Sequence, residues 1–149
     1  MLTPQEVSEH AFQKASFGGY NMHQVDEFLS EVCEWTQKQG IRFSVKTRIG
    51  MCEEDEFWEL LSVYEKHPLC ELIIHPRLQT DYYVKPVHEG LFEKAMKLSR
   101  HSLCYNGDIF SIGVFSPFQK GNRKRELTRI LLIPTVQTAL DLISLSLKP

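Results

Sequence analysis

Apolar residues recur at two different periods along the chain, and the change of period divides it. From Met22 to Trp35 they follow each other at steps of three and four residues, which is the period of an amphipathic helix. From residue 41 onward, short apolar runs alternate with longer amphipathic stretches. The first pattern predicts a helical segment over residues 1–39, and the second predicts alternating strands and helices.

Local signals place the ends of two helices in the first segment. Residues 3–6, "TPQE", combine a capping hydroxyl, a proline at the first helical position and a carboxylate three residues after the cap. Asn21 predicts a second cap, with Gln24 at the reciprocal position. The glycines at 18–19 permit a turn between the helices, and Gly40 ends the second helix.

The remainder of the chain reads as strand, helix, strand, helix, strand. The expected strands are 41–48, 70–76 and 102–110, and the expected helices are 53–67 and 86–100, the latter opened by Pro86. This order predicts parallel strands joined by crossover helices. In the tail, 113–149, a polar basic stretch precedes a further candidate strand at 130–134 and a candidate helix started by Thr135.

Composition narrows the classes of function. The chain has 149 residues, 42% hydrophobic and 24% charged, which is ordinary for a globular protein. A net charge of −2 gives no overall attraction to nucleic acid or membrane, so any such contact must come from a local patch. No apolar run approaches the roughly 20 residues of a membrane span, and the N-terminus has no secretory pattern, so we expect a cytoplasmic protein.

The cysteines are dispersed along the sequence. Cys33, Cys52, Cys70 and Cys104 form no CxxC pair, which favours reduced thiols over a disulfide framework or a zinc site. His101 and Cys104 could together bind a metal, but no second pair completes a tetrahedral set. A packed cysteine beside a surface histidine is the favoured interpretation, and we assign no metal ligands.

Polar residues recur where each expected strand ends. Lys46 and His75 are 29 residues apart, and His75 and Asn106 are 31 apart. A (β/α)₈ barrel of about 250 residues uses about 31 residues per unit, and its site lies at the carboxyl ends of its strands. A lysine that reaches solvent or a turn signal would explain any one position alone. The residues expected along one rim are Lys46, Arg48, His75, Arg77, Asn106 and Asp108.

Three stretches in order, "SVKTRIG", "ELIIHPR" and "CYNGDIF", resemble the tRNA-dihydrouridine synthases, flavoenzymes built on a TIM barrel. The resemblance covers about residues 36–112. It implies that Lys46, His75 and Asn106, with Asp108 beside them, bind FMN, and that Arg48 and Arg77 neighbour the cofactor or the RNA. The implied chemistry is hydride transfer from NADPH to FMN, and then between the flavin and the C5–C6 bond of a uridine in tRNA.

The chain departs from that family in three respects. The "NxGCP" motif with its catalytic cysteine is absent, and Cys33 lies within the helical stripe instead. The family's first four strands and its phosphate-binding loop are also absent from the sequence. We therefore expect a partial TIM-barrel-like α/β fold that is catalytically incomplete on its own, and we assign no catalytic residue. Whether the chain is an enzyme stays open.

Residues 2–32 resemble the N-terminal domain of the DivIVA family, scaffolds of the bacterial cell pole and division site. That resemblance implies self-association through a coiled coil that begins in the second helix. It also implies peripheral membrane contact, at septum or pole, by Phe17, although Phe17 could instead pack locally.

The sequence thus divides into a helical head (1–35), a partial barrel (36–112) and a tail (113–149). A basic run in the tail is most simply a solvated loop, but it could bind RNA phosphates or lipid headgroups; it comprises Lys120, Arg123, Lys124, Arg125 and Arg129.

Overall fold

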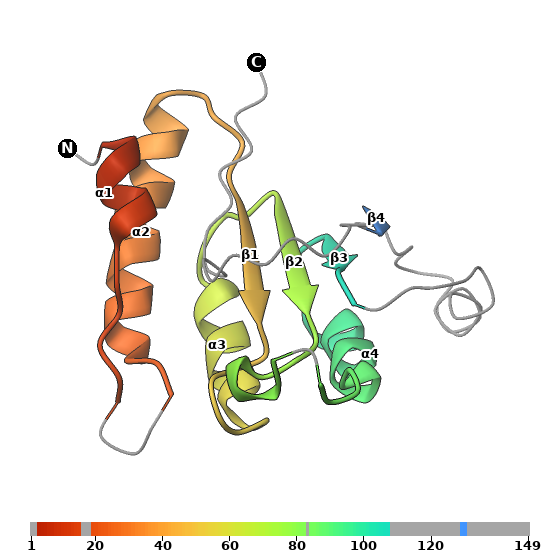
Figure 1. The fold of residues 1–149 in the computed structure, drawn as a ribbon. Helices are drawn as coiled ribbons and strands as arrows, with labels where there is room; N and C mark the ends of the chain where they lie inside the picture. The colour runs from red at the N-terminus through yellow and green to blue at the C-terminus, as the bar shows by residue number, and fades with distance from the viewer. Residues whose placement is uncertain (1–2, 16–18, 83, 108–128, 131–149) are drawn as a thin grey trace.

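A computed structural model describes residues 3–15, 19–82, 84–107 and 129–130 of the chain (Figure 1). Phe17, Asp108 and the predicted strand and helix beyond residue 130 lie outside these residues. The elements in chain order are α1 (Pro4–Glu9), α2 (Met22–Lys38), β1 (Ser44–Arg48), α3 (Glu56–Tyr64), β2 (Glu71–His75), the 3₁₀ turn η1 (Gln79–Asp81), α4 (Glu89–Leu98), β3 (Leu103–Tyr105) and β4 (Arg129–Ile130).

The strands form one open parallel sheet in the order β1-β2-β3-β4. Arg48 lies opposite His75 in the register of β1 with β2, and Ile74 lies opposite Tyr105 in that of β2 with β3. The two residues of β4 extend the sheet beside β3. An α/β fold with parallel strands alternating with helices is therefore confirmed, and the sheet is open and does not close into a barrel.

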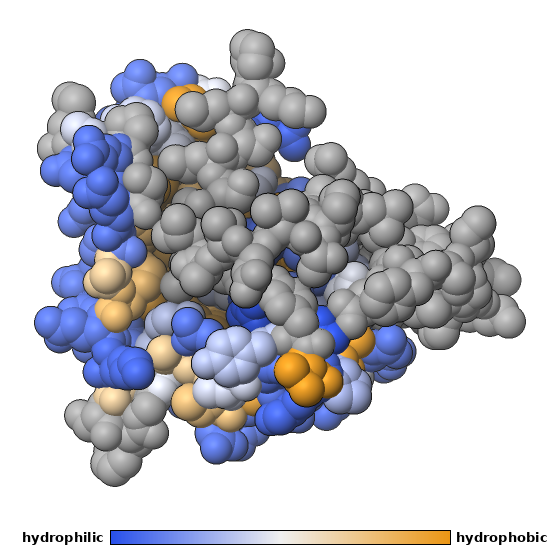
Figure 2. Space-filling view, viewed as in Figure 1, coloured by the Kyte–Doolittle hydropathy of each residue, from blue (hydrophilic) through white to orange (hydrophobic). Residues whose placement is uncertain are grey.

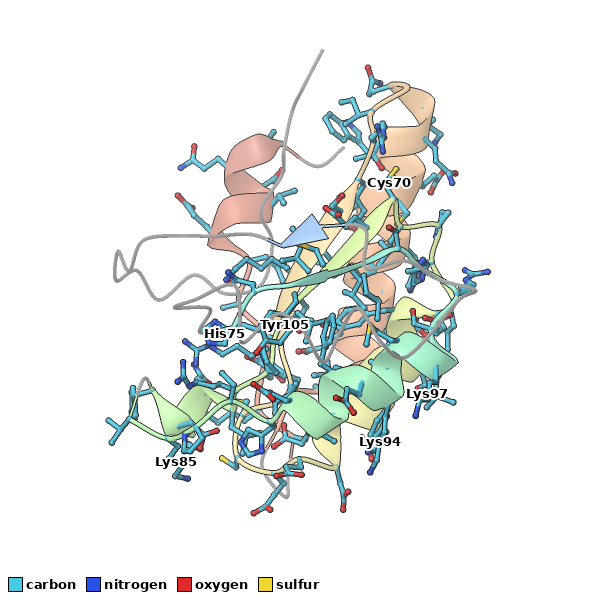
Figure 3. The ribbon with its side chains drawn as sticks, turned by 90° about the vertical axis from the view of Figure 1, so that its right-hand side faces the viewer. Cys70, His75, Lys85, Lys94, Lys97 and Tyr105 are labelled. Carbon is cyan, nitrogen blue, oxygen red and sulfur yellow. The ribbon has the colours of Figure 1, made fainter. Side chains whose placement is uncertain are left out.

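Both crossover helices pack on the same face of the sheet. The Tyr64 hydroxyl of α3 donates a hydrogen bond of 2.9 Å to Oγ1 of Thr47, and the Phe92 ring of α4 lies 5.0 Å from the ring of Tyr105. Figure 3 shows α4 on one side of the strands. Since successive side chains of a strand point to opposite faces, the residues that alternate with Thr47 and Tyr105 point away from these helices.

The two predicted helix caps form in the head. Thr3 and Glu6 make a complete capping box, with 3.2 Å from the Glu6 amide to Oγ1 of Thr3. The Asn21 side chain accepts a hydrogen bond from the Gln24 amide, as expected. The predicted return bond from Gln24 is wrong, because its side-chain oxygen accepts instead from the Gln13 amide at 2.9 Å. Gln24 therefore holds the strand-like segment before α2 and not the cap.

The apolar stripe of α2 is buried within the chain itself. His10 stacks on Phe28 at 4.1 Å, and Asp26 binds both Lys66 at 2.8 Å and His67 at 2.7 Å, which ties α2 to the end of α3. The buried residues of α2 are Val25, Phe28, Leu29, Val32, Cys33 and Thr36. All the apolar ones belong to the same core cluster as α3 and the strands. Self-association through this helix stays a prediction, as does the division into segments.

Two predicted helix starts lie too early in the sequence. α3 begins at Glu56 and not at residue 53, and α4 begins at Glu89 and not at Pro86. The delay of α4 has a local cause: the His88 amide donates to the Pro76 carbonyl at 2.7 Å, which holds the chain in a loop up to the first helical residue. No helix among the described residues is long and apolar enough to cross a membrane.

Candidate functional site

The structure brings Lys46, Arg48, His75 and Asn106 to one face of the sheet, at its carboxyl edge. This face, which we call the polar face, is the one opposite α3 and α4. Arg48 and His75 are register partners, and the Asn106 amide donates to the Ile74 carbonyl at 2.9 Å, which continues the ladder by one residue. The ends of β1 and β2 and the residue that follows β3 thus place polar residues on the same face.

The register corrects one detail of the predicted alignment. Lys46 lies opposite Ile73, so Arg48, and not Lys46, is level with His75. Lys46 sits one side-chain step further back along the same face. The reason is that the β1–β2 register pairs residues 27 apart, whereas the β2–β3 register pairs residues 31 apart. The polar face therefore extends along β1 as well as across the strands.

The two arginines contact backbone of the loop that follows β2. The Arg48 guanidinium donates to the Leu78 carbonyl at 3.1 Å, and Nε of Arg77 donates to the Lys85 carbonyl at 2.8 Å. Arg77 is buried and Arg48 is half-buried. Both arginines therefore shape the loop at residues 76–88, which we call the β2–α4 loop, in addition to any contact with a ligand.

The loop between β1 and α3, residues 49–55, is ordered by a carboxylate. Glu56 accepts hydrogen bonds from the amides of Met51, Cys52 and Glu53 at 3.0, 2.8 and 2.9 Å. Gly50 has φ +146°, and a side chain there would collide with the Glu53 carbonyl at 2.9 Å. Only glycine meets both demands at low cost, so the turn that leaves β1 is closely defined.

A buried carboxylate does the same for the β2–α4 loop. Asp81 accepts from the Leu78 amide at 2.9 Å, and it binds Nζ of Lys85 at 2.9 Å and Nε2 of His88 at 3.0 Å. Burial alone would raise the pKa of Asp81, but the hydrogen bonds from Lys85, the Leu78 amide and His88 outweigh it and lower this pKa to about 2. Asp81 is therefore ionised throughout the physiological range.

Sequence reasoning missed the residues that join these two loops. His88 binds Asp81 through Nε2 and Glu54 through Nδ1, the latter at 2.7 Å. Glu54 belongs to the β1–α3 loop, and His88 and Asp81 belong to the β2–α4 loop. A histidine seven residues after an aspartate is no motif, so the only available signal was that both loops leave the carboxyl edge of one parallel sheet.

Exposed apolar side chains lie next to this joint. Tyr82 is 69% exposed and Val84 is 90% exposed, both on the β2–α4 loop. Figure 2 shows hydrophobic colour beside hydrophilic colour at the lower edge of the molecule, where the loops after β1 and β2 lie. Tyr82 has φ +49° and ψ −121°, a conformation that a bulky residue rarely adopts.

Other candidate groups do not join the polar face. None of the four cysteines forms a disulfide with another described residue, and burial raises the pKa of the Cys33 thiol to about 11, which makes it a poor nucleophile. In Figure 3, Cys70 lies at the start of β2, far along the strand from His75, and Lys94 and Lys97 lie on the outer side of α4. The described residues contain no group of three His, Cys, Asp or Glu side chains suited to a metal ion.

The arrangement of the polar face suits a ligand that is anionic or rich in hydrogen-bond acceptors. It offers cations from β1, an imidazole from β2 and an amide from the end of β3, all at the edge where parallel α/β proteins bind their ligands. Comparisons of the chain with protein-family models, with curated proteins and with solved structures find no match. Any function must therefore be argued from the polar face itself.

Proposed function

We propose that the polar face binds FMN, and that the chain is a flavin-binding fragment similar to a tRNA-dihydrouridine synthase. The observation that carries the proposal is the convergence of Lys46, His75 and Asn106 from three neighbouring parallel strands on one face. These are the positions that the resemblance assigns to the flavin. Asp108, the fourth such position, lies outside the described residues.

The order of the sheet supports a barrel-like origin for this face. The strands follow one another in chain order, and both crossover helices pack on one side. A doubly wound sheet would instead carry helices on both faces. In a (β/α)₈ barrel the side opposite the helices is the interior, and its carboxyl end holds the ligand. The polar face corresponds to that end.

The side chains fit the charge pattern of a flavin. Lys46 supplies a positive charge on the face, which would stabilise the negative charge that develops at the N1–C2=O edge of a flavin on reduction. His75 can hydrogen-bond through its imidazole, and the Asn106 amide can both donate and accept. Arg48 and Arg77 hold the β2–α4 loop beside these groups. The chemistry that FMN supplies in that family is hydride transfer between NADPH and the C5–C6 bond of a uridine.

The proposal is one of binding and not of turnover by this chain alone. The family's catalytic cysteine motif has no counterpart in the sequence, and Cys33 is buried in the core between α2 and its neighbours. Uridine in tRNA is the substrate that the resemblance suggests. A missing proton donor would leave a bound flavin able to exchange electrons but unable to complete the reduction of a uridine.

The test is a titration of the full chain with FMN, followed by flavin fluorescence. We expect saturable binding in the wild-type chain and about tenfold weaker binding in Lys46→Ala, since loss of one charge-assisted contact costs about 1.5 kcal/mol. Lys94→Ala removes the same charge from the outer side of α4 and should leave the affinity unchanged. Equal affinities in all three proteins, or no binding by a folded chain, would refute the proposal.

The alternative is a self-associating scaffold module similar to the DivIVA head, which contacts a membrane through Phe17. The capping box of α1 and the Asn21 cap of α2 favour it, because they build two helices joined by a loop. The buried stripe of α2 weighs against it, since a coiled coil needs that stripe for a second copy. Sedimentation equilibrium distinguishes the two, because the scaffold must be at least dimeric.

A further inference from the structure

A histidine side chain connects the two loops that border the polar face, in addition to two backbone hydrogen bonds: the Gln79 amide donates to the Gly50 carbonyl at 2.9 Å, and the Thr80 amide donates to the Met51 carbonyl at 3.1 Å. Nδ1 of His88 lies 2.7 Å from Oε1 of Glu54, and its Nε2 lies 3.0 Å from Oδ2 of Asp81. The sequence separation is 34 residues from Glu54 to His88, so this contact joins separate parts of the chain. The Nε2–Oδ2 contact is a hydrogen bond, and the Nδ1–Oε1 contact is an ion pair.

The partners of His88 dictate its protonation. An ionised carboxylate can only accept hydrogen bonds, so each ring nitrogen must carry a proton to bind its partner. Asp81 is ionised because its pKa is lowered to about 2. Oε1 of Glu54 lies 2.7 Å from Nδ1, a distance at which a carboxylate and a protonated ring nitrogen form an ion pair. The observed geometry therefore belongs to the imidazolium form of His88.

We propose that Glu54, His88 and Asp81 form a proton-dependent clasp that positions the β1–α3 and β2–α4 loops beside the polar face. The clasp rests on the proposed function only for what it regulates, namely access to the FMN site. Glu54, His88 and Asp81 are positioning residues and take no part in chemistry. The clasp is closed when His88 is protonated and opens when it loses one proton.

The structure also indicates which half of the clasp opens. Asp81 is buried and keeps the Leu78 amide and Lys85 as donors, so it retains the remaining N–H of a neutral His88. Glu54 then faces a ring nitrogen with a lone pair, and it is exposed enough to turn to water. The charged groups that contact His88 are Glu54 from the β1–α3 loop and Asp81 from the β2–α4 loop, and Lys85 binds the same Asp81 carboxylate. Glu53 and Asp55 adjoin Glu54 in the sequence, and Glu89 adjoins His88.

The buried half of the clasp also holds a strained residue of the β2–α4 loop. Tyr82 follows Asp81 directly and has φ +49°, which costs free energy and persists only where its surroundings hold it. Asp81 supplies that hold through Leu78, Lys85 and His88. Opening at Glu54 leaves these three contacts in place, so the β2–α4 loop keeps its conformation and the β1–α3 loop is the part that is released.

The test uses the ¹⁵N-labelled full chain and needs no ligand. We measure the ring ¹⁵N shifts of His88 and the amide hydrogen exchange of residues 51–55 from pH 5 to 9, the range in which histidines change charge. Exchange rates are corrected for the intrinsic effect of pH. We expect exchange of residues 51–55 to accelerate about fivefold, with the same midpoint as the His88 shifts, while Ser99–His101 at the opposite edge show no step.

Glu54→Gln is the decisive variant. The glutamine amide can accept from a protonated Nδ1 or donate to a neutral one, so the step in exchange should disappear while the fold is kept. Glu53→Gln removes the same charge from the neighbouring exposed residue and should keep the step. A step that survives in Glu54→Gln, or no step in the wild type while His88 titrates, would overturn the clasp. These outcomes do not depend on FMN, whose titration decides the proposed function separately.

Discussion

The two edges of the sheet both carry a histidine close to a carboxylate, but they differ in what surrounds it. At the amino edge, Glu65 accepts from the Ser99 hydroxyl and from the Arg100 amide at 2.9 Å, and His101 binds the Tyr64 carbonyl at 2.9 Å. These contacts join the end of α3 to the segment before β3. We call Glu65, Ser99, Arg100 and His101 the amino-edge cluster.

At the carboxyl edge, the corresponding joint of Glu54, His88 and Asp81 lies beside side chains that the strands themselves project. Lys46, Arg48 and His75 belong to the strands themselves, whereas at the amino edge the first residues of β1 and β2 are Ser44 and Glu71, and Arg42 precedes β1. This comparison indicates that a histidine–carboxylate contact alone does not identify a ligand-binding site. Cations on strands, on the face away from the helices, are the distinguishing feature of the carboxyl edge.

The largest loss of stability is expected from a mutation in the hydrophobic core, which both edges of the sheet share with the helical head. Phe28→Ala should destabilise the chain by about 3–5 kcal/mol, because Phe28 is 4% exposed and packs against His10 and Phe12. Urea unfolding followed by circular dichroism measures this. Glu31→Ala, on the exposed side of the same helix, is the control. If Phe28→Ala leaves the unfolding of the α/β part unchanged, the head does not share its core.

The second prediction concerns the stability of the fold in acid, which should depend on Asp81 at the carboxyl edge. Hydrogen bonds lower the folded-state pKa of Asp81 to about 2 against its own burial, so Asp81 stabilises the fold above its unfolded pKa of about 4 and loses this contribution as pH falls toward 2. The amount is on the order of 2 kcal/mol. Asp81→Asn should be less stable near neutral pH and should lose less stability between pH 4 and 2. If Asp81→Asn loses as much stability between pH 4 and 2 as the wild-type chain does, the lowered pKa is wrongly assigned to Asp81.

The smallest effect is expected at the amino edge. Glu65→Gln keeps one acceptor oxygen but loses the charge that Ser99 and Arg100 contact, which should cost about 1 kcal/mol by urea unfolding. FMN affinity should not change, since Glu65 lies at the edge away from the polar face. A drop in affinity as large as that of Lys46→Ala would remove the distinction between the edges.

Local signals in the sequence predicted the elements well, because each depends on a few adjacent residues. The capping box at Thr3 and Glu6, the Asn21 cap and the end of α2 before Gly40 all form. The polar ends of the strands were also predictable, since they interrupt apolar runs. The convergence of these ends on one edge then follows from the parallel order of strands alone.

What the sequence did not predict depends on contacts between loops. The alignment of Arg48 with His75 could be known only from the observed strand register, because the first strand–helix unit is shorter than the barrel spacing assumes. The contact of Glu54 with His88 could not be predicted, because it depends on the conformations of two loops, which Glu56 and Asp81 help to fix through their backbone partners. The delayed start of α4 has the same origin.

The most direct test of the central claim is to locate the ligand on the molecule. We would add FMN to the ¹⁵N-labelled chain and record which backbone amide signals shift. The account predicts shifts at residues 46–49, 75–78 and 104–106, and none at Ser99–His101 of the amino-edge cluster. Shifts confined to the amino edge or to the outer side of α4, or no shifts at all in a folded sample, would contradict the assignment of the polar face as the functional site.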